Sequence, residues 1–161
     1  MIDPMDLQGH PYIEGWRDCY TLAQDYYQKA WGLQLRNYAR PKGWELLPEL
    51  NFFETLFERE GFFEPTTNVK DVQVGDALLM ALGQTPCSNH IAIYVGGGNI
   101  LHHLFQQHSR VEPYSDRWRF RVRKVLRWRH ADTFKEGVSL EDLAKAPRSL
   151  RHKLTGVAPH E

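Results

Sequence analysis

The sequence has few cysteines, no net charge and no long apolar run. Two cysteines, Cys19 and Cys87, occur in 161 residues, too few for the disulfide scaffold of a small secreted domain, and a reducing compartment would keep both as thiols. Twenty basic residues balance twenty acidic ones, so overall charge favours no polyanionic partner. No stretch approaches the roughly 20 consecutive apolar residues of a membrane span. Composition therefore predicts a soluble globular protein.

The start of the chain also shows no export signal. Residues 1–6 contain neither a basic region nor an apolar run, so we expect synthesis in the cytoplasm. The length predicts one domain. Because the composition changes after His130, we assign residues 1–130 to that domain and residues 131–161 to a C-terminal extension. In the extension, Ser139–Ala146 has the character of a capped short helix, and the remainder is expected to be partly mobile.

A helix is predicted to begin at Cys19. Apolar side chains recur at helical spacing from this residue, Asp18 is a good N-cap, and Gly32 stands where a glycine commonly ends a helix. A cysteine in a first turn feels the positive end of the helix dipole, which favours the thiolate and lowers the thiol pKa. The alternative is a buried structural thiol, because free cysteine is among the most buried residue types.

A hairpin with three histidines follows far along the chain. Residues 89–95 alternate as a half-buried strand that His90 opens, Gly96–Gly98 form a turn, and residues 99–104 return with His102 and His103. A lone cysteine with distant histidines is the expected arrangement of a cysteine nucleophile, its base and an orienting group.

Three motifs resemble the NlpC family of papain-like cysteine peptidases. They are "YIEGWRDCYTL", "VGDALLM" and "NHIAIYVGGGNILHH", and they are most similar to the versions in tail-assembly proteins of lambda-like bacteriophages. Their order and spacing make the resemblance specific, and it runs from about Pro11 to about His130. It implies an α+β, papain-like fold in which the cysteine-bearing helix packs on an antiparallel sheet.

The resemblance also implies the chemistry. Cys19 corresponds to the nucleophile, His90 to the base and His102, twelve positions later, to the orienting residue. Tyr12 and Asp18 would line the active site, with the Cys19 backbone N–H and Tyr12 serving the oxyanion. No cofactor or metal is implied. The chain departs from the family where Tyr20 and Thr21 replace the usual Ser-Gly pair, which is expected to narrow or reshape the cleft.

Hairpin parity bears on the choice between His102 and His103. A two-residue turn at Gly97–Gly98 would place Ala92 opposite His103, whereas a three-residue turn at Gly96–Gly98 would place it opposite His102. The triple glycine supplies the positive φ that the longer turn needs. We therefore predict the three-residue turn and His102, with His103 in reserve.

Other segments complete the predicted fold. We expect a helix at Asn51–Glu60, a first core strand at Val72–Met80, and a turn rather than chemistry at Gly75-Asp76. Short strands are expected at Arg110–Tyr114 and Val122–Trp128, around one helical turn at Ser115–Phe120. These strands follow the cysteine helix, so the layout is α+β.

A basic, aromatic segment precedes His130. Its eight cationic side chains, interleaved with aromatic residues, would suit nucleic acid. However, the charge balance and the absence of a nucleic-acid fold motif favour an exposed strand face that covers aromatics or meets an acidic surface. The cationic residues are Arg110, Arg117, Arg119, Arg121, Arg123, Lys124, Arg127 and Arg129.

Two rival functions remain open. Cys87 and His90 have C-x-x-H spacing, and His102, His103 and His108 could complete a zinc site. Alternatively, the chain is a structural tail protein that keeps a peptidase fold with little activity. The favoured function is hydrolysis of a peptidoglycan stem peptide by a phage tail-associated enzyme, which is made in the host cytoplasm and joins tail-tip partners in the virion.

Overall fold

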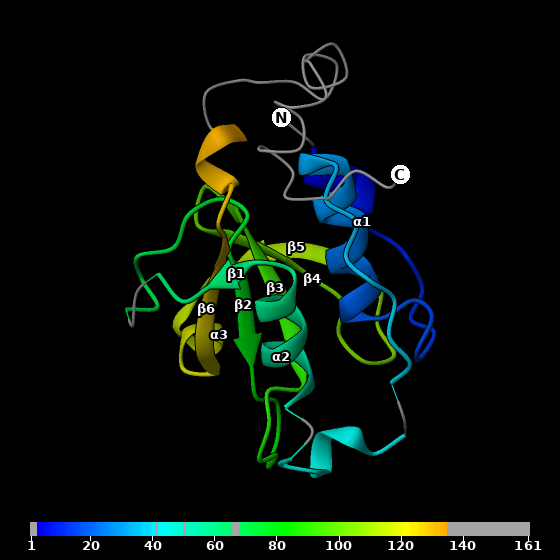
Figure 1. Ribbon diagram of the computed structural model, residues 1–161. Coiled ribbons are helices and arrows are strands. Elements are labelled where there is room, and N and C mark those ends of the chain that lie inside the picture. Colours follow the sequence, from blue (N-terminus) through cyan, green and yellow to red (C-terminus); the bar gives the residue numbers. More distant parts are fainter. Residues whose placement is uncertain (1–2, 41, 50, 66–67, 135–161) are drawn as a thin grey trace, which may run out of the picture.

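The computed structural model describes residues 3–40, 42–49, 51–65 and 68–134 (Figure 1). Its centre is a six-stranded antiparallel sheet in the order β1-β6-β2-β3-β4-β5. The strands are β1 (Phe62–Phe63), β2 (Ala77–Met80), β3 (His90–Gly96), β4 (Asn99–His102), β5 (Arg110–Pro113) and β6 (Val122–Trp128). Helices cover both faces, which confirms the predicted α+β class.

Helix α1 (Cys19–Trp31) is the main helix of the domain. The Asp18 side chain caps its start by accepting from the N–H groups of Tyr20 and Thr21, and Gly32 ends it in the left-handed conformation, as predicted. Its buried face packs against β3. Rings from α1 dominate the shared core, where Tyr27 stacks on Trp31 and Trp31 stacks on Trp128 of β6.

The sheet has two different faces because side chains alternate along each strand. On one face Ile91, Ile93 and Leu101 join the core formed with α1 and α2 (Phe52–Arg59). On the other face Ala92 and Ile100 pack with Trp118 of the short helix α3 (Asp116–Arg119). The cysteine-bearing helix and α3 therefore lie on opposite sides of one sheet.

The β3–β4 hairpin combines features of both predicted turns. Ala92 pairs with His102, as predicted, but the register shifts after Tyr94, so that Gly96 pairs with Asn99. Gly97 and Gly98, both with positive φ, form a two-residue turn. The predicted three-residue turn was therefore wrong, while the predicted pairing is confirmed, because a bulge supplies the extra residue.

The Gly75-Asp76 pair is structural, as predicted. Gly75 has φ +91 and lies so close to Trp31 that a Cβ would meet the indole at 2.4 Å. Asp76 is 1% exposed and forms a bidentate ion pair with Arg127, at 2.8 and 2.7 Å. This tight turn delays the strand, so β2 begins at Ala77 rather than at the predicted Val72.

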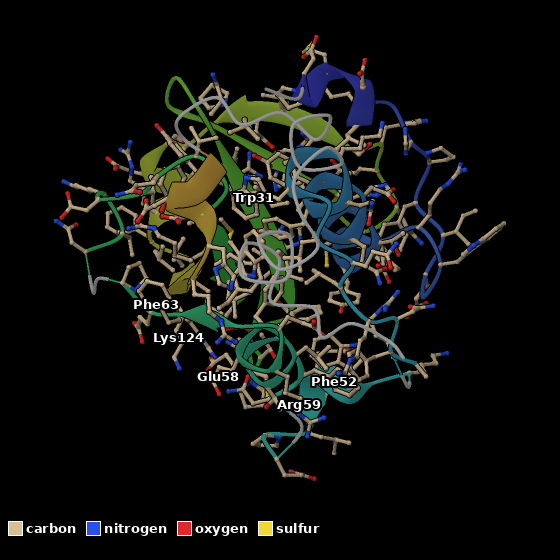
Figure 2. The ribbon with its side chains drawn as sticks, turned by 45° about the horizontal axis from the view of Figure 1, so that its top comes forward. Trp31, Phe52, Glu58, Arg59, Phe63 and Lys124 are labelled. Carbon is tan, nitrogen blue, oxygen red and sulfur yellow. The ribbon has the colours of Figure 1, made fainter. Side chains whose placement is uncertain are left out.

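Most of the cationic side chains in the basic segment bind the protein itself. Lys124 pairs with Glu54 of the acidic helix α2 at 2.8 Å, and Figure 2 shows Lys124 at the edge that carries Glu58 and Arg59. The carboxylates Glu54, Glu64 and Glu58 raise the Lys124 pKa. Arg123 donates to the carbonyls of Pro86 and Thr85. These contacts support the prediction of a strand face that meets the protein's own acidic surface.

The segment after α1 runs back along the helix and brings Arg40 beside Asp18. Figure 1 shows it as the light-blue coil next to α1. The Tyr20 hydroxyl donates to the Arg36 carbonyl at 2.6 Å, and the Gln24 amide donates to the Leu35 carbonyl at 3.0 Å. Residues 33–40 form no helix or strand, and because these contacts are not periodic the sequence alone does not predict the path of the segment.

The remaining predictions for local structure have mixed outcomes. Helix α2, strands β5 and β6 and the turn at α3 agree with prediction to within two residues. The predicted helix at Ser139–Ala146 lies outside the described residues, and the proposed boundary after residue 130 stays a prediction. Within the described ranges, no helix is long and apolar enough to cross a membrane.

Candidate active site

Cys19 is the first residue of α1 and lies against the start of β3. Backbone N–H groups of Ile91 and Tyr20 both hydrogen-bond the sulfur and act to lower the thiol pKa. The side chain is half-buried, and it contributes to the wall of a cleft. The capped helix therefore presents a thiol to a cleft, which is the placement that a nucleophile requires.

The expected lowering of the Cys19 pKa is not found. Burial, together with the nearby Asp18 carboxylate, raises the pKa of the Cys19 thiol to about 12. The two backbone N–H groups and Arg40 oppose this shift, but desolvation of the charged form outweighs them. The sequence prediction considered the helix terminus and omitted the cost of burying a thiolate. Cys19 is thus a neutral thiol near pH 7.

The cleft above Cys19 has a volume of about 300 Å³. Aromatic residues form much of its wall, and polar side chains converge near the sulfur, which suits a peptide-like ligand better than a purely apolar one. The lining residues are Tyr12, Glu14, Gly15, Asp18, Cys19, Arg40, Trp44, Glu45, Phe53, Asn89 and Phe105.

Asp18 has more partners than an N-cap alone. One carboxylate oxygen accepts from the backbone N–H groups of Tyr20 and Thr21 at 3.1 and 3.0 Å. The other accepts from the Gly15 N–H at 3.1 Å and from Arg40 Nε at 2.7 Å. Both side chains of the Asp18–Arg40 pair are about nineteen-twentieths buried, with 6% and 5% exposed. Asp18 therefore links the helix start, the preceding loop and the returning segment.

A buried chain of hydrogen bonds begins at His90. His90 Nε2 lies 3.1 Å from His102 Nδ1, and His102 Nε2 lies 2.5 Å from a Glu112 oxygen. Arg110 Nε donates to the same carboxylate at 3.0 Å, and the Trp118 ring packs edge-on against His102. The structure thus brings His90 and His102 together and adds Glu112, which the sequence analysis did not identify.

The order of acceptors along these hydrogen bonds determines the tautomers of His90 and His102. Burial lowers the pKa of His90 well below its usual value and also lowers that of His102, so both rings are neutral near pH 7. The Glu112 pKa is also lowered, by its hydrogen bonds to His102 and Arg110, which outweigh its partial burial. Ionised Glu112 accepts, so His102 carries its proton on Nε2 and accepts at Nδ1. His90 must then carry its proton on Nε2, which leaves Nδ1 unprotonated and able to act as a base.

His103, the reserve third residue, lies apart from this chain of bonds. Its Nε2 donates to the Gln107 carbonyl at 3.0 Å, and its ring meets Tyr12 edge-on with centroids 5.3 Å apart. Tyr12 also contacts Phe105 on the cleft wall. His103 thus supports the predicted lining residue Tyr12 and does not hydrogen-bond His90.

No direct hydrogen bond joins Cys19 to His90 among the described residues. The sulfur touches β3 at Ile91, the residue after His90, while the His90 side chain is 3% exposed and does not line the cleft. Nδ1 of His90 is the ring nitrogen not used toward His102. Catalytic hydrogen bonds in ligand-free enzymes are commonly long and tighten when substrate binds.

The zinc alternative is not supported by the geometry. Cys87 is buried and its thiol donates to the Leu47 carbonyl at 3.3 Å, while His90 and His102 bond to each other. In the part of the chain that the structure describes, no three His, Cys, Asp or Glu side chains are grouped as metal ligands. The C-x-x-H spacing therefore does not correspond to a site.

Two residues of the site were missed from sequence. Glu112 had an available signal, since it lies on a predicted strand and its parity places it on the face of His102, whose pairing partner is Arg110. Arg40 had none, because its contact with Asp18 depends on the path of an irregular segment. The Tyr20 replacement has a different consequence from the expected one: Tyr20 is buried under that segment and does not line the cleft.

Comparison with known proteins agrees with this arrangement. The sequence model of the NlpC/P60 family matches residues 9–127. Tail tip assembly protein K of Escherichia phage lambda is 35% identical over 124 residues, which are 77% of this chain and 59% of that protein. The protein of the same name from Escherichia phage N15 is 29% identical over 127 residues, 78% of this chain and 50% of that protein. The chain thus spans only about half to three-fifths of these relatives.

A solved structure extends the similarity to the fold. The NlpC/p60 domain of the peptidoglycan hydrolase SagA superposes with a TM-score of 0.50 over 77% of this chain and 92% of that one. The sequences are 18% identical, so this similarity concerns the fold alone. It agrees with the papain-like arrangement of α1 on the antiparallel sheet.

Proposed function

Because this chain belongs to the NlpC/P60 family, we propose that it is a cysteine peptidase that hydrolyses an amide bond in the stem peptides of peptidoglycan. The observation that carries the proposal is a cleft with Cys19 at the start of α1, backed by the bonded pair His90 and His102. The family supplies the substrate class, and the site supplies the groups that the reaction needs.

The reaction would begin with the neutral thiol. As Sγ of Cys19 attacks the amide carbonyl, its proton passes to Nδ1 of His90, and the tetrahedral oxyanion is held by the Cys19 backbone N–H and Tyr12. The imidazolium then protonates the leaving amine, which leaves a thioester on Cys19. Water hydrolyses the thioester with His90 again acting as base, and the thiol is restored.

His102 and Glu112 would act as positioning residues. Their bonds to each other and to His90 fix the tautomer that leaves Nδ1 of His90 unprotonated. The Glu112 carboxylate also stabilises the positive charge that spreads over the two rings when His90 takes the thiol proton. Arg110 holds that carboxylate in place.

The direct test is digestion of purified peptidoglycan by the wild-type protein and by Cys19→Ala, followed by analysis of the released fragments. We expect new amino and carboxyl ends only with the wild type. If neither protein releases fragments, the peptidase proposal fails.

A second candidate is a structural tail protein that keeps this fold with little activity. The observations that favour it are the raised Cys19 pKa and a His90 side chain that does not reach the cleft. In either case we propose that the chain joins tail-tip proteins of a phage after synthesis in the host cytoplasm, as the names of its relatives suggest. Mass spectrometry of purified virions would test incorporation, and phage with Cys19→Ala should still assemble tails.

A further inference from the structure

Phe120, at the end of helix α3, is the most exposed large apolar side chain among the described residues. The residue is 86% exposed, and its N–H donates to the Asp116 carbonyl at 3.1 Å. Trp118, which is 3% exposed, anchors α3 in the core on that face of the sheet. The Phe120 ring therefore projects from a fixed backbone, and a preorganised side chain of this kind loses little conformational entropy when it binds a partner.

Arginines flank Phe120 on both sides. In the described part of the chain Arg117 and Arg121 form no ion pair, and Arg121 donates to the Arg117 carbonyl instead. Arg119 pairs with Asp116 at 3.1 Å, but the Asp116 side chain is 69% exposed, so solvent screens this pair. Phe120 and the three arginines, here termed the α3 surface, therefore present an apolar ring within an excess of positive charge.

A second pocket lies beside α2, on the side of the sheet opposite to α3. Its volume is about 230 Å³, and Tyr38, Phe52 and Leu56 contribute apolar surface to its wall. Glu49 and Arg59 also line it, and Figure 2 shows Phe52 and Arg59 beside α2. This α2 pocket shares no lining residue with the cleft that contains Cys19.

The chain around the α2 pocket is acidic, whereas the α3 surface is basic. Residues 44–64 contain six glutamates and one arginine, and residues 117–123 contain four arginines and no carboxylate. Glu54 pairs with Lys124, and Glu60 pairs with Arg36. Within the described ranges the other four glutamates of this segment form no ion pair, namely Glu45, Glu49, Glu58 and Glu64. The zero net charge therefore combines two regions of opposite sign.

We propose that the α3 surface of one molecule docks on the α2 pocket of a second copy, with Phe120 in the pocket and the arginines against the surrounding glutamates. Aromatic and arginine side chains are enriched at protein interfaces, and an anchor that fills a pocket commonly carries much of the binding energy. The two surfaces lie on opposite sides of the sheet, so they meet only between molecules, and the contact is head to tail. This inference does not depend on the proposed peptidase activity.

Sedimentation velocity of the full-length protein, with a reducing agent to prevent disulfide formation, tests the proposal. The weight-average mass of the wild type should rise with concentration, to about twice that of the monomer near about 1 mM, as expected for a small transient interface. Salt at about 0.5 M should reduce this association, because it screens exposed charges. Phe120→Ser should remain monomeric. Phe63→Ser is the matched control, because Phe63 is 47% exposed and lies apart from Phe52 and Arg59 in Figure 2; it should associate like the wild type.

A substitution on the other surface completes the test. Thr55 is exposed and lines the α2 pocket, so Thr55→Arg should block the pocket and also remain monomeric, with folding of each variant checked by thermal melting. An equimolar mixture of Phe120→Ser and Thr55→Arg keeps one intact α3 surface and one intact pocket, so it should form a one-to-one dimer and nothing larger. A monomeric wild type, association insensitive to salt, association that survives either substitution, or a mixture that stays monomeric would overturn the proposal. None of these results bears on the digestion of peptidoglycan.

Discussion

The two sides of Cys19 differ in how completely their polar groups are paired. On the sheet, His90, His102 and the partly exposed Glu112 form a series in which each successive contact is a hydrogen bond. On the cleft side, Nη2 of Arg40 is buried and has no hydrogen-bond partner among the residues that the structure describes. A fully satisfied polar network holds its groups in one arrangement, whereas a buried polar group without a partner carries a desolvation cost. The difference separates the paired histidine part of the site, suited to proton transfer, from the cleft wall around Arg40.

The largest expected effect comes from replacing His90, the proposed general base. If the proposed peptidase is active, His90→Ala should lower kcat by about 10³- to 10⁴-fold, because it removes the proposed acceptor of the thiol proton. Peptide hydrolysis by the folded variant measures this. His103→Ala is the control, since His103 is bonded to Gln107; an equal loss in both variants would contradict the assignment of the base.

Alkylation of Cys19 probes the boundary between the two sides. With a thiol pKa of about 12, the thiolate fraction at pH 7 is about 10⁻⁵, against about 3% for a free cysteine. Iodoacetamide should therefore label Cys19 about three orders of magnitude more slowly than a free thiol. The rate should rise about tenfold per pH unit as the pH approaches 12, as long as the fold persists.

Mass spectrometry distinguishes the Cys19 label from label on Cys87. Rapid labelling of Cys19 at neutral pH, with a plateau below pH 8, would mean that the thiol is already poised as a thiolate. That result would weaken the proposal of a structural tail protein. It would favour an enzyme whose resting state holds Cys19 as a thiolate paired with an imidazolium.

A smaller effect is expected from the far end of the histidine chain. Glu112→Leu removes the acceptor that fixes the His102 tautomer, and we expect kcat to fall by about 10²-fold, the usual scale for misplaced catalytic groups. Glu112→Gln keeps an acceptor and should lose less activity. Histidine tautomers are read from nitrogen chemical shifts, and an unchanged His102 signal in Glu112→Leu would exclude the positioning role.

The smallest predicted effect is that of Asp18→Asn on the pKa of the Cys19 thiol. Asp18→Asn retains a good N-cap residue but removes a charge that raises the Cys19 pKa. The thiol pKa should therefore fall, and alkylation near neutral pH should become faster. Glu14→Gln is a useful comparison, because it removes a carboxylate from the exposed rim of the same cleft, where solvent screens charge.

The sequence was sufficient for the parts of the site that depend on local patterns. The capped helix at Cys19 and the pairing of Ala92 with His102 followed from capping residues and from strand alternation. Arg40 and the Cys19 pKa could not be obtained in this way. The first depends on a segment held by single bonds from Tyr20 and Gln24, and the second depends on desolvation, which only the packed structure determines.

The glycine turn of the β3–β4 hairpin limits how this chain can change in length. The bulge before Gly96 and the turn at Gly97 and Gly98 together set which histidine faces His90. Deleting one residue here would exchange the two faces of the return strand, so that His103 would replace His102 and Leu101 would leave its core for that of Ile100. At this turn, insertions or deletions of two residues should therefore be tolerated better than those of one residue. Substitutions that preserve the length leave the pairing of the two strands unchanged.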